Sequence, residues 1–200
     1  STRFIGGVSA SDRLPEWLER YLFAEQLEWV NRTADTCMFE LIGPGSGSLL
    51  EHAIGVQIGD LPPFGHTLTE VDFGLARVDI GPSLRILIFV DHKSSIALWD
   101  KLLDRQPQII GEIAFDALRV QFGVPFPGSE LNEEHNPWEA GLGEAIHLDK
   151  GCYIGQEVIA RLDTYDKVKQ RLVGVALPSG ALPPKGTPLH SDDRAVGAIT

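Results

Sequence analysis

A short apolar segment limits the possible folds more than any other part of the sequence. Residues 84–90 read Leu-Arg-Ile-Leu-Ile-Phe-Val, and a second strand-like segment at residues 71–80 precedes Gly81-Pro82-Ser83. Branched apolar residues favour strands and a Gly-Pro-Ser sequence favours a turn, so this pattern predicts a hairpin. The apolar segment includes a charge and is too short to cross a bilayer, so we expect no membrane association through it.

Helix-like and strand-like segments alternate irregularly along the rest of the chain. Apolar residues at helical spacing predict helices that begin near Leu14, Leu49, Ile96, Glu112 and Gln156. Further strand-like segments are residues 29–30, 38–42, 171–177 and 194–200. Since no regular strand–helix–strand rhythm is present, we expect an α+β fold rather than a doubly wound sheet.

The composition excludes several classes of protein. A hydrophobic fraction of 43% over 200 residues is enough to bury a core without disulfides or a structural metal. The net charge of −11 excludes a nucleic-acid scaffold, because phosphate binding depends on clustered Lys and Arg. Two cysteines, without metal-ligand spacing, predict a cytoplasmic protein with no disulfide framework and no built-in metal. The apolar residues around Cys37 predict that it is buried in a strand, and the position of His92 near a turn predicts a solvated histidine.

The segment that carries chemistry is residues 150–157, Lys-Gly-Cys-Tyr-Ile-Gly-Gln-Glu. It places the Cys152 thiol after a glycine, near a lysine and ahead of the helix expected from Gln156. A nearby ammonium group or helix N-terminus favours a thiolate over a thiol, and glycine lets the backbone approach a ligand closely. Cysteine is also among the residues most often buried, so local chemistry alone leaves Cys152 as either a reactive thiol or a packed turn residue. His147, five residues earlier, is a candidate base if the loop folds back.

This octapeptide resembles the signature of the YgfZ proteins, a folate-binding family related to the glycine-cleavage T protein. Similar segments are Leu-Ile-Gly-Pro at 41–44, the helix-to-loop element at 114–125, Asn-Pro-Trp-Glu-Ala-Gly-Leu at 136–142 and Gln-Arg-Leu-Val-Gly at 170–174. The resemblance implies the α+β folate-binding fold of the T protein over residues 1–167, with its N-terminal part missing. It also implies that residues 168–200 begin a truncated C-terminal β-barrel domain. The strand-like segment at 194–200, with no later partner, favours the same interpretation.

The resemblance further implies a function and the residues that perform it. Tetrahydrofolate is the implied cofactor, and the implied role is the assembly or repair of iron–sulfur clusters, with iron–sulfur proteins or assembly factors as partners. The functional thiol corresponds to Cys152, supported by Lys150, Gly151, Tyr153, Gly155, Gln156 and Glu157. The candidate folate-binding residues are Arg119, Gln121 and Arg161. We expect the two arginines either to meet the anionic glutamate tail of folate or to be ordinary surface or ion-paired cations.

Two other functions stay open, so the sequence does not decide whether the protein is an enzyme. The first is an aminomethyltransferase, the T protein itself, which moves a one-carbon unit to tetrahydrofolate. Where that family has an arginine and a glutamate, this sequence has Phe115 and Gln121, and a phenyl ring cannot replace a bidentate guanidinium clamp. The second is a non-catalytic, folate-binding regulatory module in which Cys152 only packs.

Overall fold

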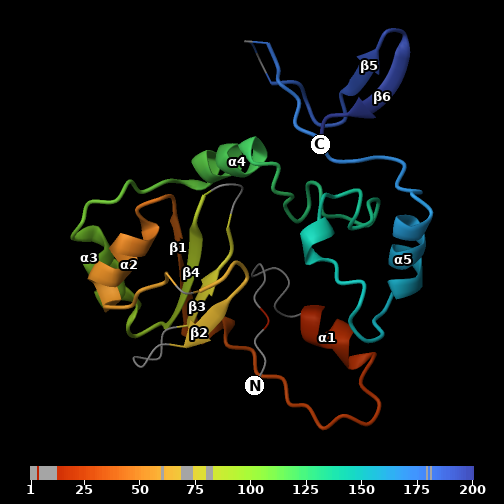
Figure 1. Cartoon of the computed structure of the whole chain (residues 1–200). Coiled ribbons are helices and arrows are strands. Elements are labelled where there is room, and N and C mark those ends of the chain that lie inside the picture. The colour runs from red at the N-terminus through yellow and green to blue at the C-terminus, as the bar shows by residue number, and fades with distance from the viewer. Residues whose placement is uncertain are drawn as a thin grey trace. The chain divides into compact units, whose positions relative to one another are not determined.

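The computed structural model describes residue 4 and residues 13–59, 61–68, 74–79, 83–178, 180 and 182–200. The chain divides into two units, Ser1–Ile109 and Ile110–Thr200. Helices and antiparallel strands occur together in the chain, which confirms the α+β class (Figure 1). None of the described helices is long and apolar enough to span a bilayer.

Unit 1 is built around a four-stranded antiparallel sheet. Its strands are β1 (Thr36–Ile42), β2 (His66–Leu68), β3 (Gly74–Arg77) and β4 (Arg85–Asp91), in the order β1-β4-β3-β2. The predicted pairing of the segments at 71–80 and 84–90 is confirmed for β3 and β4, with Leu75 opposite Ile88. Residues 71–73 and 80–82, which include most of the predicted turn, lie outside the described residues. On the other side of β4, β1 pairs from Thr36 opposite Asp91 to Ile42 opposite Arg85.

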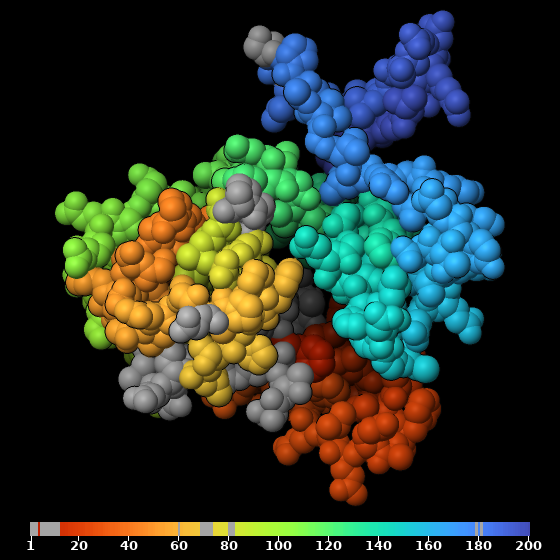
Figure 2. All heavy atoms as spheres, in the orientation of Figure 1, coloured from red at the N-terminus to blue at the C-terminus, as the bar shows by residue number. Residues whose placement is uncertain are grey.

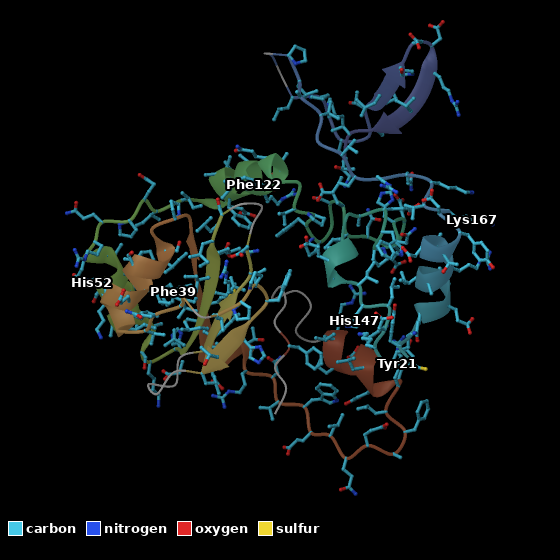
Figure 3. All side chains as sticks on the ribbon, in the orientation of Figure 1. Tyr21, Phe39, His52, Phe122, His147 and Lys167 are labelled. Atoms are coloured by element: carbon cyan, nitrogen blue, oxygen red, sulfur yellow. The ribbon has the colours of Figure 1, made fainter. Side chains whose placement is uncertain are left out.

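One face of this sheet packs against two helices, α2 (Ser46–Ile54) and α3 (Ser95–Leu103), which also contact each other. Successive strand residues point to opposite faces, so alternate residues of β1 and β4 meet the helices. Phe39 points from β1 into this layer and stacks on Trp99, with 5.9 Å between ring centroids (Figure 3). The outer side chains of α2 and α3 form neighbouring parts of the surface (Figure 2). The buried cluster consists of Leu50, Ala53, Ile58, Leu75, Ile86, Ile88, Val90, Leu98 and Leu102, with Cys37, Phe39 and Leu41 packed against it.

The β1–β4 pair carries an ion pair on its other face. Arg85 Nε and Nη2 donate to the two carboxylate oxygens of Glu40 at 2.7 and 3.1 Å. Bidentate geometry of this kind fixes both side chains and therefore supports the register of the two strands. Before the sheet, the chain forms α1 (Arg13–Glu19) and the 3-10 turn η2 (Thr33–Asp35).

Unit 2 contains α4 (Glu112–Gln121), the 3-10 turn η3 (Gly143–Ala145), α5 (Gln156–Thr164), β5 (Pro188–Ser191) and β6 (Arg194–Ala198). Helix α4 ends where Gly123 adopts a φ of 67°. The bonds from Gly123 N to Val120 O and from Val124 N to Arg119 O, at 3.1 and 2.8 Å, then satisfy carbonyl groups of the last turn.

Several of the predicted strands differ from the structure. Residues 29–30 and 171–177 form no strand. In residues 171–177, the only backbone hydrogen bond to another described residue is from Leu172 N to Glu139 O, at 2.8 Å. An alternating pattern needs a partner strand to form a ladder, and no partner is present for these residues among those described. The segment at 194–200 does form β6, and its partner is the preceding β5. Strand β2 was not predicted, because its three residues are all exposed and carry no alternation.

The packing of β4 against the helices predicts a large stability loss on truncation of its central residue. Ile88 is fully buried, so Ile88→Ala should lower the free energy of unfolding by about 2–5 kcal/mol. Met38, on the neighbouring strand, is 51% exposed, and Met38→Ala should cost less than about 1 kcal/mol. Urea unfolding of both variants measures the difference, and equal midpoints would show that the Ile88 side chain is not in the core.

Candidate functional site

The predicted reactive segment forms a loop that leads into α5. Cys152 is exposed, so its sulfur can be reached from solvent. Gly155, which precedes the first helical residue Gln156, has a φ of 85°, a left-handed conformation that favours glycine. The turn is closed by Gln156 N, which donates to Tyr153 O at 3.2 Å, and Ile159 N donates to Gly155 O at 3.1 Å. The helix therefore begins where the sequence predicted it.

Lys150 and Tyr153, on either side of Cys152 in the chain, contact each other. Lys150 Nζ lies 4.8 Å from the centroid of the Tyr153 ring, which is cation–π geometry. The Tyr153 hydroxyl is buried and has no hydrogen-bond partner among the described residues. A buried hydroxyl without a partner costs on the order of 1–3 kcal/mol.

No hydrogen bond joins the predicted base, His147, to the thiol of Cys152. His147 Nδ1 accepts a hydrogen bond from Asp149 N at 3.2 Å, so the ring is engaged within its own loop (Figure 3). Within the described ranges, no side chain makes a hydrogen bond to Cys152 Sγ. Gln156 is half-buried, and Glu157 is exposed in the first turn of α5, where a carboxylate is favoured by the helix dipole.

The candidate folate-binding residue Arg119 is buried in an ion-pair network. Its side chain is 7% exposed; Nε lies 2.5 Å from Asp116 Oδ1 and Nη1 lies 3.0 Å from Glu130 Oε2. Glu130 is equally buried and also accepts hydrogen bonds from Phe126 N at 2.9 Å and from the Thr200 hydroxyl at 3.2 Å. This geometry matches the ion-paired alternative of the sequence analysis. Contact between Arg119 and folate stays a prediction.

The other two candidate folate-binding residues, Gln121 and Arg161, have exposed side chains. Gln121 ends α4, and Arg161 lies in the last turn of α5. In the part of the chain that the structure describes, no contact joins Arg119, Gln121 and Arg161 into one site. Their shared role in folate binding therefore stays a prediction as well.

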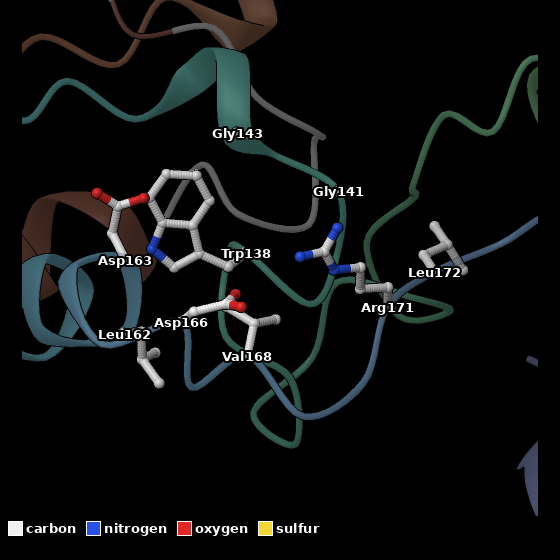
Figure 4. Close-up of a pocket in the computed structure, with 9 residues that line it drawn as sticks. All are labelled: Trp138, Gly141, Gly143, Leu162, Asp163, Asp166, Val168, Arg171 and Leu172. Atoms are coloured by element: carbon white, nitrogen blue, oxygen red, sulfur yellow. The ribbon is translucent and has the colours of Figure 1, made fainter.

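A cavity of about 350 Å³ lies beside α5 within unit 2, and the sequence analysis did not identify it (Figure 4). Trp138 forms an aromatic wall, and its ring is fixed because Nε1 donates to Ile159 O at 3.1 Å. Asp163 in the last turn of α5, Asp166 just after the helix and Arg171 on the segment that follows place two negative charges and one positive charge around the same space. Cys152 is not among the residues that line it.

The turn that presents Trp138 is held by reciprocal capping. Asn136 Oδ1 accepts hydrogen bonds from the backbone N of Trp138 and Glu139 at 3.0 and 3.1 Å, and the Glu139 carboxylate accepts one from Asn136 N at 3.1 Å. Gly143 packs on the ring, because a Cβ at that position would lie 3.4 Å from the indole. No sequence pattern marks the cavity, since its walls come from separate segments that only folding brings together.

The comparison with known families identifies the chain. Residues 3–150 match the model described as the GCVT N-terminal domain. The chain belongs to this family. The match covers most of unit 1 and the first part of unit 2 and ends at Lys150, just before Cys152. The coarser part of the predicted resemblance, to proteins like the glycine-cleavage T protein, is therefore confirmed.

The relatives of this GCVT-family chain are named as transferases. A chloroplastic protein of Arabidopsis thaliana with a transferase name is 36% identical over 92% of the chain and 43% of its own length. An aminomethyltransferase of Synechococcus elongatus is 29% identical over 95% of the chain and 51% of its own length. Another, of Symbiobacterium thermophilum, is 32% identical over 87% of the chain and 49% of its own length. The chain thus spans about half the length of the curated relatives it matches.

The described residues of this GCVT-family chain contain no group of three or more His, Cys, Asp and Glu side chains that could hold a metal ion. Cys37 and Cys152 are both free thiols.

The Arg119 network predicts a stability loss that an exposed arginine does not produce. Arg119→Met should lower the free energy of unfolding by about 3–5 kcal/mol, because it leaves the charge of Glu130 buried without its partner. The double change Arg119→Met with Glu130→Met should recover part of that loss. Arg161→Met, at an exposed position, should change stability by less than about 0.5 kcal/mol. Urea unfolding of the variants measures these effects, and equal small losses for both single arginine variants would contradict the structural role of Arg119.

Proposed function

We propose that the protein that contains this chain is a tetrahydrofolate-binding member of the GCVT family, of the YgfZ type, that supports iron–sulfur cluster assembly or repair through Cys152. The observation that carries the proposal is the exposed thiol within Lys-Gly-Cys-Tyr-Ile-Gly-Gln-Glu, directly before α5. Iron–sulfur proteins or assembly factors are the proposed partners. Because a thiolate binds iron and attacks disulfides, Cys152 would hold a cluster or a sulfur species transiently or exchange disulfides.

The residues around Cys152 have separate parts in this proposal. Gly155 supplies the left-handed turn that lets the loop enter α5, and Gly151 lies in open space beside Cys152 in the chain. Lys150 adds a positive charge next to the Tyr153 ring. The unpaired Tyr153 hydroxyl is a hydrogen-bonding group for a bound molecule or partner. Gln156 and Glu157 belong to the first turn of the helix.

Tetrahydrofolate fits the chemistry of the cavity beside Trp138. A ring system can stack on the indole, and Asp163 and Asp166 can accept hydrogen bonds from ring N–H groups. The volume of about 350 Å³ is at the lower end of ligand pockets, so it suits a ring system rather than the whole cofactor. When bound, the cofactor supplies a carrier for one-carbon units. Arg119, Gln121 and Arg161 stay the alternative binding residues from the sequence analysis.

Aminomethyl transfer to tetrahydrofolate is the second candidate function. The names of the bacterial relatives, which are aminomethyltransferases, favour it. Against it, Phe115 and Gln121 stand where the sequence analysis expects the arginine and glutamate of aminomethyltransferases. The third alternative, a regulatory module in which Cys152 only packs, is disfavoured because Cys152 is exposed.

The domain division and the compartment belong to the same proposal. We propose that residues 1–167 form the folate-binding domain and that residues 168–200 begin a β-barrel domain, supported by the β5–β6 hairpin in the second segment. The two free cysteines support a reducing compartment such as the cytoplasm. One relative is named as chloroplastic, so the chloroplast is the alternative compartment in this proposal.

Rescue of an iron–sulfur enzyme tests the role of Cys152. In cells that lack the protein, the full-length wild type should restore the enzyme's activity, and Cys152→Ser should not, because serine has no sulfur to bind iron or exchange disulfides. Ile113→Ser, which changes an 89% exposed residue in the same unit, is the matched control and should rescue fully. Rescue by Cys152→Ser at equal protein abundance would show that the thiol is not needed to support the iron–sulfur enzyme.

Ligand-induced stabilisation tests folate binding at the cavity. Tetrahydrofolate should raise the melting temperature of the full-length protein by mass action. At a ligand concentration of one hundred times its Kd, the free energy of unfolding should rise by about 2.7 kcal/mol. Trp138→Ala and Asp163→Asn should reduce the shift, and Asp104→Asn, an exposed change in unit 1, should not. An undiminished rise in melting temperature in both cavity variants would show that folate binds outside this cavity. Formation of methylene-tetrahydrofolate from an aminomethyl-lipoyl carrier would favour the second candidate function.

A further inference from the structure

Cys37 and His92, which the sequence analysis treated separately as a buried strand residue and a solvated histidine, lie in contact. Cys37 Sγ is 3.2 Å from His92 Nδ1, within hydrogen-bond distance for sulfur. Cys37 is half-buried and His92 is exposed, so a small molecule can approach the pair from solvent. The two residues belong to unit 1 and share no residue with the loop that carries Cys152.

The register of β1 and β4 produces this contact. Cys37 is opposite Val90, and β4 ends at Asp91 opposite Thr36, so the turn that begins with His92 starts beside the first residues of β1. The backbone of His92 is held on both sides. Its N donates to Asp35 O at 2.8 Å, and its O accepts a hydrogen bond from the Ser95 hydroxyl at 2.8 Å. The imidazole is therefore positioned against the sulfur by the strand pairing and the start of α3.

We propose that Cys37 and His92 form a second reactive thiol site, which exchanges with small-molecule disulfides. Nucleophilic cysteines in proteins are activated by an imidazole at hydrogen-bond distance, which is the arrangement seen here. This site does not depend on the function proposed for Cys152. It adds a modification site to the sheet of unit 1, where the sequence analysis expected only packing.

The exchange balances without any further reactant. With its own proton on Nε2, His92 takes the proton of the Cys37 thiol on Nδ1. The thiolate attacks one sulfur of the disulfide, so a bond forms between Cys37 Sγ and that sulfur as the original S–S bond breaks. The departing thiolate takes the proton from His92. The products are a mixed disulfide on Cys37 and one molecule of free thiol.

Charges of both signs surround the pair. Asp35, on η2, lies 3.5 Å from Arg32 Nε, and Asp91 and Lys93 flank His92 in the chain. The backbone N–H of Ser94, which donates to Asp91 at 3.0 Å, lowers the pKa of the Asp91 carboxyl below its ordinary value. Since these charges nearly balance, a neutral disulfide is the probe whose approach they influence least.

The test uses the whole chain with Cys152→Ser, in which Cys37 is the one remaining thiol. The probe is 2-hydroxyethyl disulfide, and mass spectrometry follows the mixed disulfide. A free thiol is only a few per cent ionised at pH 7, so full proton transfer to His92 raises the rate by up to about thirtyfold. His92→Asn keeps a hydrogen-bonding group near the sulfur but takes no proton, and it should lower the rate at pH 7 by at least about fivefold. His92→Gln provides a second variant without a base and should behave in the same way.

The matched control is His66→Gln, on β2 at the opposite edge of the sheet, which should leave the rate unchanged. At pH 10, above the ordinary thiol pKa of about 8.5, the parent and both His92 variants should react at equal rates, because the thiol ionises without a base. Equal rates at pH 7 would overturn the proposal. A deficit that persists at pH 10 would also overturn it, because that result indicates altered packing or access rather than a lost base.

Discussion

The antiparallel pairing of β1 with β4 is the contact on which the rest of unit 1 depends. It joins Thr36 to Asp91 and Ile42 to Arg85, across the intervening helix and strands, and it decides which side chains face α2 and α3. A shift of β1 by one residue against β4 would turn Phe39 away from the core, so the buried cluster and the register hold each other in place. The same register produces two polar contacts, between Arg85 and Glu40 and between Cys37 and His92.

Unit 2 is organised by polar contacts more than by a sheet. The buried pair of Arg119 and Glu130 ties α4 to the loop after it, and the capped turn at Asn136 sets Trp138 against the backbone of α5. Long loops can keep a defined shape in this way, because buried polar groups such as those of Arg119 and Glu130 are satisfied by partners several residues away. The exposed loop of Cys152 and the cavity beside Trp138 are both supported by α5, through its first and last turns.

The two thiols of the chain differ in their surroundings. Cys152 is exposed, lies just beyond the segment that matches the GCVT N-terminal domain, and has a glycine-dependent turn and a helix start after it. Cys37 lies inside the matched segment, packs partly against the core and has an imidazole at its sulfur. Cys152 is open to solvent, as the proposed exchange with proteins requires, and Cys37 has the adjacent imidazole on which the proposed exchange with small disulfides depends. The family shows what fold the chain has, and these local environments separate the chemistry of its thiols.

The sequence by itself determined the features that depend on neighbours in the chain. The apolar segment at 84–90 became β4, the helical spacing from Glu112 became α4, and Gly155 before Gln156 began α5, because periodicity and glycine conformation are local properties. The octapeptide around Cys152 and the likeness to the T protein family were also readable without coordinates. Residues 171–177 show the limit of such patterns, since alternation forms a strand only where a partner is present. Only the tertiary structure decided that Arg119 pairs with Glu130 and that His92 meets Cys37. It also decided that Trp138, Asp163 and Arg171 line one cavity. Each of these contacts depends on packing between separate segments, which no local pattern encodes.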